Sequence, residues 1–82
     1  MLGNFNPSVI TNEIYNILED YEVQVDTYKH EAIYSIIDYF TNNLHIEYLL
    51  NCCDWPNEEG GVCAISFIDN GHPQLVTFDY MF

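Results

Sequence analysis

Two runs of β-forming residues flank the dipeptide Asn70-Gly71 near the end of the sequence. Asn-Gly is the favoured pair for a two-residue type I′ turn, because both central residues need a positive φ, which glycine adopts freely and asparagine at small cost. The sequence therefore predicts one β-hairpin over residues 62–80, with Cys63 opposite Phe78. This register places six residues on one face, which we expect to be the core face: Cys63, Ile65, Phe67, Val76, Phe78 and Tyr80.

Two segments before this hairpin carry apolar residues at helical spacing. Asn6-Pro7 suits the start of the first helix, since asparagine is a good N-cap and proline a good first helical residue. We expect Asp26 or Thr27 to cap the second helix and Asn42-Asn43 to end it. The stripes that define the two helices are Ile10, Ile14, Ile17, Leu18 and Tyr21, and Ile33, Ile36, Ile37, Phe40 and Leu44.

Alternating apolar and polar residues predict a strand over 21–28 and another over 45–52, and residues 54–61 have the composition of a loop. The predicted fold is a single α+β domain over residues 1–82, with two helices packed on a small, mainly antiparallel sheet of three to four strands in the order α-β-α-β-β-β. The strand over 21–28 joins one side of the sheet, in either orientation. Pro73 lacks an N–H but falls in a non-hydrogen-bonded pair of the hairpin, so it is harmless if the last strand is a sheet edge at that point.

The chain carries thirteen acidic residues and one basic residue, Lys29, for a formal net charge of −12. With one lysine and no arginine it cannot neutralise a phosphate backbone or adhere to an anionic membrane, which excludes direct binding to nucleic acid or membrane. A basic partner is expected instead. No apolar run approaches the length of about 20 residues that spans a bilayer, and the first residues lack the pattern of a signal peptide, so we expect a cytoplasmic protein.

Six acidic residues between positions 19 and 38, with one tyrosine among them, form the predicted partner-binding surface. Within the predicted strand, Glu22 and Asp26 face the same side, about 13 Å apart. If the fold presents these carboxylates on one surface, that surface imitates a nucleic-acid backbone, whose charges recur every ~3.4 Å along each strand. The alternative is an acidic face that is merely solvated. The predicted residues are Glu19, Asp20, Glu22, Asp26, Glu31, Tyr34 and Asp38.

The sequence predicts neither a metal site nor an active site. The three cysteines and three histidines show no paired metal-ligand spacing, so we expect no cofactor and reduced thiols. The chain has no glycine-rich phosphate loop and no basic group suited to stabilise an oxyanion. Trp55-Pro56 and Glu58-Glu59 lie in one predicted loop, where Trp55 either anchors a partner or covers an end of the core.

The order of elements and the acidic charge resemble the small inhibitors of uracil-DNA glycosylase made by phages and mobile elements. Glu31-Ala32-Ile33 stands where family members tend to carry Glu-Ser-Ile, and residues 64–69 are similar to a late strand of the family. The resemblance implies that Glu22, Asp26 and Glu31 stand in for DNA phosphates. It also implies an apolar cavity between helix and sheet that takes up a side chain of the enzyme.

These observations predict a non-enzymatic acidic inhibitor, a monomer or homodimer, that blocks the nucleic-acid-binding surface of a basic enzyme. A uracil-DNA glycosylase, a CRISPR effector and a restriction enzyme are the expected kinds of target. One alternative is an immunity protein that neutralises a basic toxin nuclease, which would also be small and acidic. A second is an accessory structural domain whose acidity has no specific target.

Overall fold

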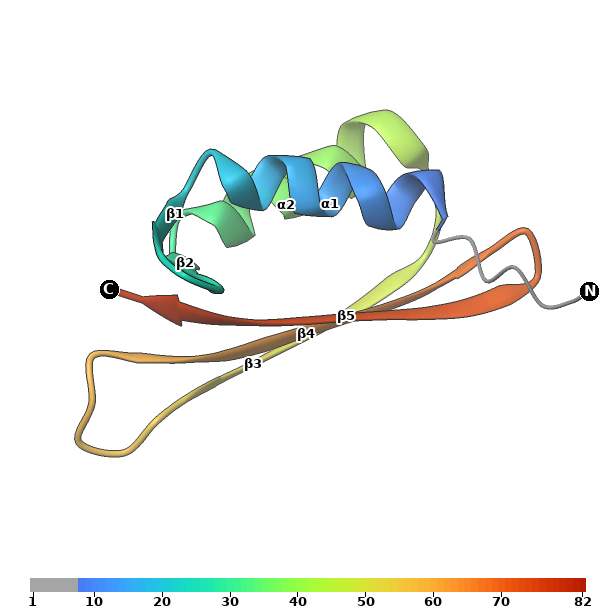
Figure 1. Cartoon of the computed structure of the whole chain (residues 1–82). Coiled ribbons are helices and arrows are strands. Elements are labelled where there is room, and N and C mark those ends of the chain that lie inside the picture. Colours follow the sequence, from blue (N-terminus) through green and yellow to red (C-terminus); the bar gives the residue numbers. More distant parts are fainter. Residues whose placement is uncertain (1–7) are drawn as a thin grey trace, which may run out of the picture.

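The computed structural model describes residues 8–82, which form two helices and a five-stranded mixed sheet (Figure 1). The α+β class is as predicted, but the sheet has more strands than expected. The order of helices and strands along the chain is α-β-β-α-β-β-β. Along the sheet the strands run β1-β2-β5-β4-β3, so β3 is an edge strand. The elements are α1 (Val9–Glu19), β1 (Glu22–Gln24), β2 (Thr27–Lys29), α2 (Ala32–Tyr39), the π-helical turn η1 (Phe40–Leu44), β3 (Tyr48–Asp54), β4 (Gly60–Asp69) and β5 (His72–Met81).

The hairpin of β4 and β5 has the predicted register, with Cys63 opposite Phe78. Asn70 has a φ of 51° and Gly71 a φ of 82°, as a type I′ turn requires. All six residues predicted on the core face are buried. Pro73 is tolerated because β2 pairs with β5 only over Asp79–Met81, which leaves β5 as an edge at the proline.

The single strand predicted over residues 21–28 is wrong, because the chain turns back within it. Asp26 has a φ of 57°, a left-handed conformation that aspartate tolerates better than most residues, and β1 and β2 form a short antiparallel hairpin around it. Val23 and Val25, two of the apolar residues in the alternation that predicted the strand, are 45% and 83% exposed. Asp26 therefore lies in the turn, not four residues along one strand face from Glu22. The hairpin joins the sheet through β2, which runs parallel to β5.

The helix boundaries also differ from those predicted. Asn6-Pro7 lies outside the described residues, and Ser8 is the N-cap of α1, where its hydroxyl accepts a hydrogen bond of 3.0 Å from the Thr11 N–H. Neither Asp26 nor Thr27 caps α2, because both belong to the β1–β2 hairpin, and the N-cap is Glu31. The helix continues past Asn42-Asn43 through η1 to His45, whose φ of 57° ends it.

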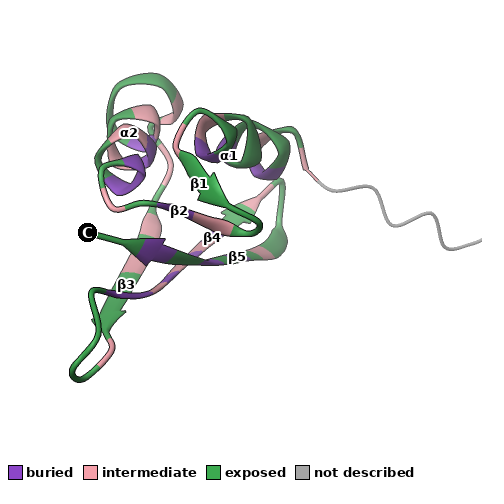
Figure 2. Cartoon of the chain, turned by 60° about the vertical axis from the view of Figure 1, so that its left-hand side comes forward, coloured by how far each residue is buried: buried purple, intermediate pink, exposed green. Residues whose placement is uncertain are grey.

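The core lies between the two helices and one face of the sheet (Figure 2). Ile14 and Leu18 of α1 and Ile36 of α2 are fully buried in the same cluster as Ile65 and Tyr80 of the sheet. Burying each such aliphatic side chain stabilises the fold by about 1.5–3 kcal/mol. Among residues 8–82, both helices lie on this one face, so the opposite face of the sheet is uncovered (Figure 1). We call it the open face.

Gly61 of β4 lies opposite Tyr80, and a Cβ there would overlap the Tyr80 hydroxyl and the Cys53 carbonyl oxygen. Gly61→Ala is expected to lower the free energy of unfolding by about 1–3 kcal/mol, because neither neighbour can move freely. Urea unfolding measures the change. The exposed Thr77→Ala is the control and should stay within about 0.5 kcal/mol of the wild type. An equal effect of both substitutions would contradict the tight packing at Gly61.

Candidate protein-binding surface

The acidic side chains of the protein face solvent. All thirteen lie in the described part of the chain, where twelve are exposed and Asp69 is half-buried. Two of them accept hydrogen bonds from side chains, Asp38 from the Asn42 amide and Asp54 from the Tyr80 hydroxyl. The fold therefore displays its negative charge at the surface, where a partner can reach it.

Three of the seven predicted partner-binding residues gather around Tyr28. The pKa of the Tyr28 hydroxyl is raised by burial and then by the carboxylates of Asp26, Glu22 and Glu19. The β1–β2 hairpin makes this possible, since it sets Glu22 directly opposite Tyr28, and α1 ends at Glu19 just before β1. We call Glu19, Glu22 and Asp26 the hairpin cluster.

The other four predicted residues lie elsewhere on the surface. Asp20 is the exposed C-cap of α1. Glu31 precedes α2 and lines a small hollow with Lys29. Tyr34 is 63% exposed and its ring stands edge-on to His30, with 5.6 Å between ring centroids. Asp38 is exposed farther along α2, where it accepts its hydrogen bond from Asn42.

A second acidic group, which the sequence did not predict as one site, surrounds Trp55. A hollow of about 340 Å³ lies between the β3–β4 loop, the β1–β2 hairpin and the end of β5. The loop is fixed by backbone bonds: the Trp55 N–H donates to the Gly60 carbonyl (2.9 Å) and the Phe82 N–H to the Glu59 carbonyl (3.3 Å). We call this the Trp55 hollow. Its lining residues are Gln24, Thr27, Trp55, Glu58, Glu59, Asp79 and Met81.

The sequence placed Trp55, Glu58 and Glu59 in one loop but missed Asp79. Asp79 reaches the hollow because β2 pairs with β5 and sets Thr27 beside it. That pairing joins segments about fifty residues apart, and no local signal predicts it. The alternation of β5 did place Asp79 on the face opposite Tyr80, which is the open face.

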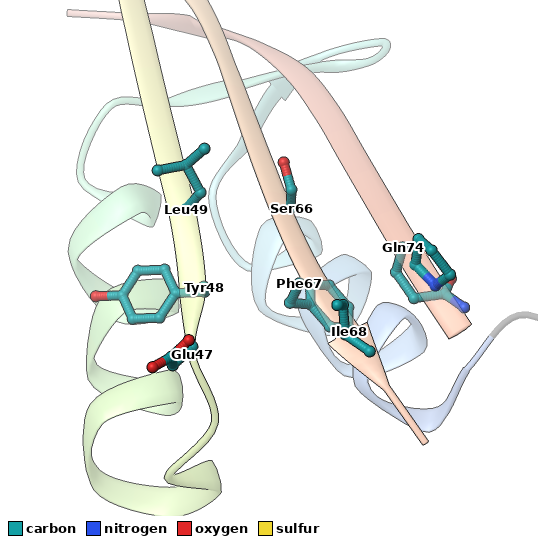
Figure 3. A pocket seen from close by; sticks show the side chains of 8 residues that line it. Glu47, Tyr48, Leu49, Ser66, Phe67, Ile68 and Gln74 are labelled. Carbon is teal, nitrogen blue, oxygen red and sulfur yellow. The ribbon is translucent and has the colours of Figure 1, made fainter. Parts of the chain in front are cut away.

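A larger and more apolar hollow of about 630 Å³ opens where β3 begins, near the β4–β5 turn (Figure 3). Leu49 and Ile68 at its wall are each 62% exposed. This hollow involves the open side of the sheet, not the helix–sheet cavity that the family resemblance implied. Its lining residues are Glu47, Tyr48, Leu49, Ser66, Phe67, Ile68, Pro73 and Gln74.

Tyr80 is fully buried beside the β3–β4 hairpin, and its hydroxyl donates a hydrogen bond to the Asp54 carboxylate. Burial first, and then this hydrogen bond, raises the pKa of Tyr80 above its ordinary value. The neutral hydroxyl is thus the form that the folded protein favours. Tyr80 is accordingly a structural residue that ties β5 to the end of β3.

This raised pKa predicts a loss of stability in alkali. Above about pH 10 the unfolded chain releases the Tyr80 proton and the folded protein keeps it, so the free energy of unfolding falls as the pH rises. Below that pH the contribution of Tyr80 is fully present. Urea unfolding between pH 8 and pH 11 should show this decline, and Tyr80→Phe should reduce its slope.

Some slope should remain in the Tyr80→Phe variant, because burial also raises the pKa values of Tyr28, Tyr39 and Cys63. The exposed Tyr34→Phe should keep the wild-type slope; the same slope in both variants would contradict this role of Tyr80.

The three cysteines are free and differ in exposure. Cys52 and Cys63 lie opposite each other on β3 and β4 with their sulfur atoms 3.0 Å apart, and Cys53 is exposed beside them. Burial raises the pKa of Cys63, followed by its contact with Cys52. Since the thiolate is the reactive form, Cys63 is the least reactive of the three.

Alkylation of the folded protein with iodoacetamide at pH 8 should therefore modify Cys52 and Cys53 well before Cys63. Peptide mapping by mass spectrometry reads the order directly. In urea the three rates should converge, which serves as the control. Labelling of Cys63 at the rate of Cys53 in the folded protein would contradict its burial.

Comparisons with known proteins give no relative: no family model, no curated protein and no solved structure matches the chain. Within residues 8–82, no three histidine, cysteine or acidic side chains lie close enough together to hold a metal ion. Of the helices in the same range, none combines the length and the apolar character that crossing a membrane needs.

Proposed function

We propose that the protein is a non-enzymatic inhibitor that occupies the nucleic-acid-binding surface of a basic enzyme. The observation that carries this proposal is the display of charge: twelve of thirteen acidic side chains are exposed in a chain with a single lysine. A net charge of −12 exceeds the magnitude of about 2–8 that is enough to keep a small domain soluble. A basic partner accounts for the excess.

The hairpin cluster is the first part of this surface that we assign to the partner. Its three carboxylates are exposed and lie around one buried tyrosine, Tyr28, which places them on one part of the surface. Lysines and arginines that hold nucleic-acid phosphates bind carboxylates by the same charge-assisted hydrogen bonds. The charge of the whole molecule would speed association, and apolar contacts would slow dissociation.

The proposal is tested by binding to a panel of purified nucleic-acid enzymes: a uracil-DNA glycosylase, a restriction endonuclease and a CRISPR effector nuclease. Surface plasmon resonance at 50 and 300 mM salt should show tight binding to one of them, weakened at least tenfold by the added salt. Duplex DNA should compete with the protein for that enzyme, and the protein should inhibit its activity.

Matched variants separate the hairpin cluster from net charge. Glu19→Gln, Glu22→Gln and Asp26→Asn together should weaken binding at least tenfold and reduce its salt dependence. Glu13→Gln, Glu47→Gln and Asp69→Asn change the net charge equally and should weaken it less than threefold. Partners that duplex DNA does not displace would defeat the proposal, as would no binding to enzymes of this class at low salt.

A further inference from the structure

We propose that the Trp55 hollow binds an arginine side chain of the basic partner. The nature of the partner rests on the proposed function, but the preference for arginine follows from the hollow alone. Trp55 is the one tryptophan of the chain and stands half-buried in this wall. Three elements that are distant in sequence meet here, namely β2, the β3–β4 loop and the end of β5.

Charge in the hollow is unbalanced. Glu58, Glu59 and Asp79 line it and are exposed, and none of its lining residues is basic. The single basic residue, Lys29, lines a different hollow together with Glu31. Lys29 lies opposite Met81, which lines both hollows, and one lysine cannot balance three carboxylates, so a cation from another molecule would complement them.

The size and the apolar part of the lining fit one long cationic side chain. A volume of about 340 Å³ is at the lower end of the range of about 300–1,000 Å³ typical of small-molecule sites. Met81, an exposed apolar residue, contributes a wall against which methylene groups can pack. The hollow is too small for a folded element and is lined mostly by exposed residues, so a side chain from outside can enter it.

The aromatic wall favours arginine over lysine. A guanidinium is planar and weakly hydrated, so it can stack on an indole ring while its N–H groups bind carboxylates in pairs. An ammonium is compact and strongly hydrated, and it gains less from both contacts. A cation over a tryptophan face contributes more than one over any other aromatic ring. Trp55 with carboxylates on neighbouring elements provides both kinds of contact in one place.

The fluorescence of Trp55 gives a direct readout, because no other tryptophan contributes. The protein is titrated with acetylated hexa-arginine, hexa-lysine and hexa-citrulline peptides in 50 mM salt. Citrulline has the shape of arginine without its charge. We expect hexa-arginine to change the emission and to bind at least fivefold tighter than hexa-lysine, and hexa-citrulline to leave the emission unchanged.

Matched charge variants locate the site. Glu58→Gln with Asp79→Asn should weaken hexa-arginine binding about tenfold, while Glu13→Gln with Glu47→Gln, equal in net charge, should weaken it less than threefold. Trp55→Leu, followed by isothermal titration calorimetry, should remove the preference for arginine over lysine. Circular dichroism checks that each variant is folded, and Trp55→Phe replaces Trp55→Leu if the latter is not.

Equal affinity for the arginine and lysine peptides would overturn the arginine site, as would equal weakening by the two charge pairs. Neither result touches the proposed function, which is tested by competition with duplex DNA on the enzyme panel. Conversely, arginine-selective binding with no enzyme captured would support the hollow and defeat the proposed target class. The two proposals can thus fail separately.

Discussion

The structure depends on the packing of one face of the β4–β5 hairpin against α1 and α2. The acidic side chains of a chain with a net charge of −12 repel one another when the chain becomes compact. Because the chain has a single lysine and no arginine, ion pairs cannot offset this repulsion. Burial of apolar side chains therefore has to supply the stability. The hairpin does so with six alternating residues that meet the apolar stripes of both helices. Every acidic residue can then stay at the surface.

The parts that the sequence predicted well are those set by local chemistry. Asn70-Gly71 determines the turn, and the turn determines the register of β4 and β5 and hence which residues are buried. The parts missed depend on single backbone conformations or on distant pairing. Alternation over residues 21–28 cannot reveal that Asp26 turns left-handed, nor can it reveal that β2 runs parallel to β5. The Trp55 hollow shows the same limit. The sequence places Trp55, Glu58 and Glu59 in one loop, whereas Asp79 joins them only through the pairing of β2 with β5.

Two parts of the surface divide the work that the proposals assign to the protein, and they adjoin at the β1–β2 hairpin, whose Gln24 and Thr27 line the Trp55 hollow. The hairpin cluster lies where α1 meets β1, and it gathers charge around a tyrosine. The open face of the sheet has no helix over it within residues 8–82 and combines exposed aliphatic residues with the Trp55 hollow. Long-range attraction needs only the first kind of surface. Selection of one basic protein among many needs fixed shapes and apolar contact, which the second kind provides.

β3, which forms one of the two edges of the sheet, carries no charged residue from Tyr48 to Cys53. Proteins usually protect such a border with lysines, prolines or bulges, because unpaired backbone groups there invite another chain to add a strand. Here the exposed carboxylates on the rest of the molecule give neighbouring copies a like charge, whose repulsion opposes such strand addition. The strength of this repulsion depends on pH. Near the isoelectric point of about 4.1 the repulsion between copies vanishes, and β3 can then pair with a strand of another chain. The uncharged edge strand thus makes the solubility of the protein depend on the ionisation of its carboxylates.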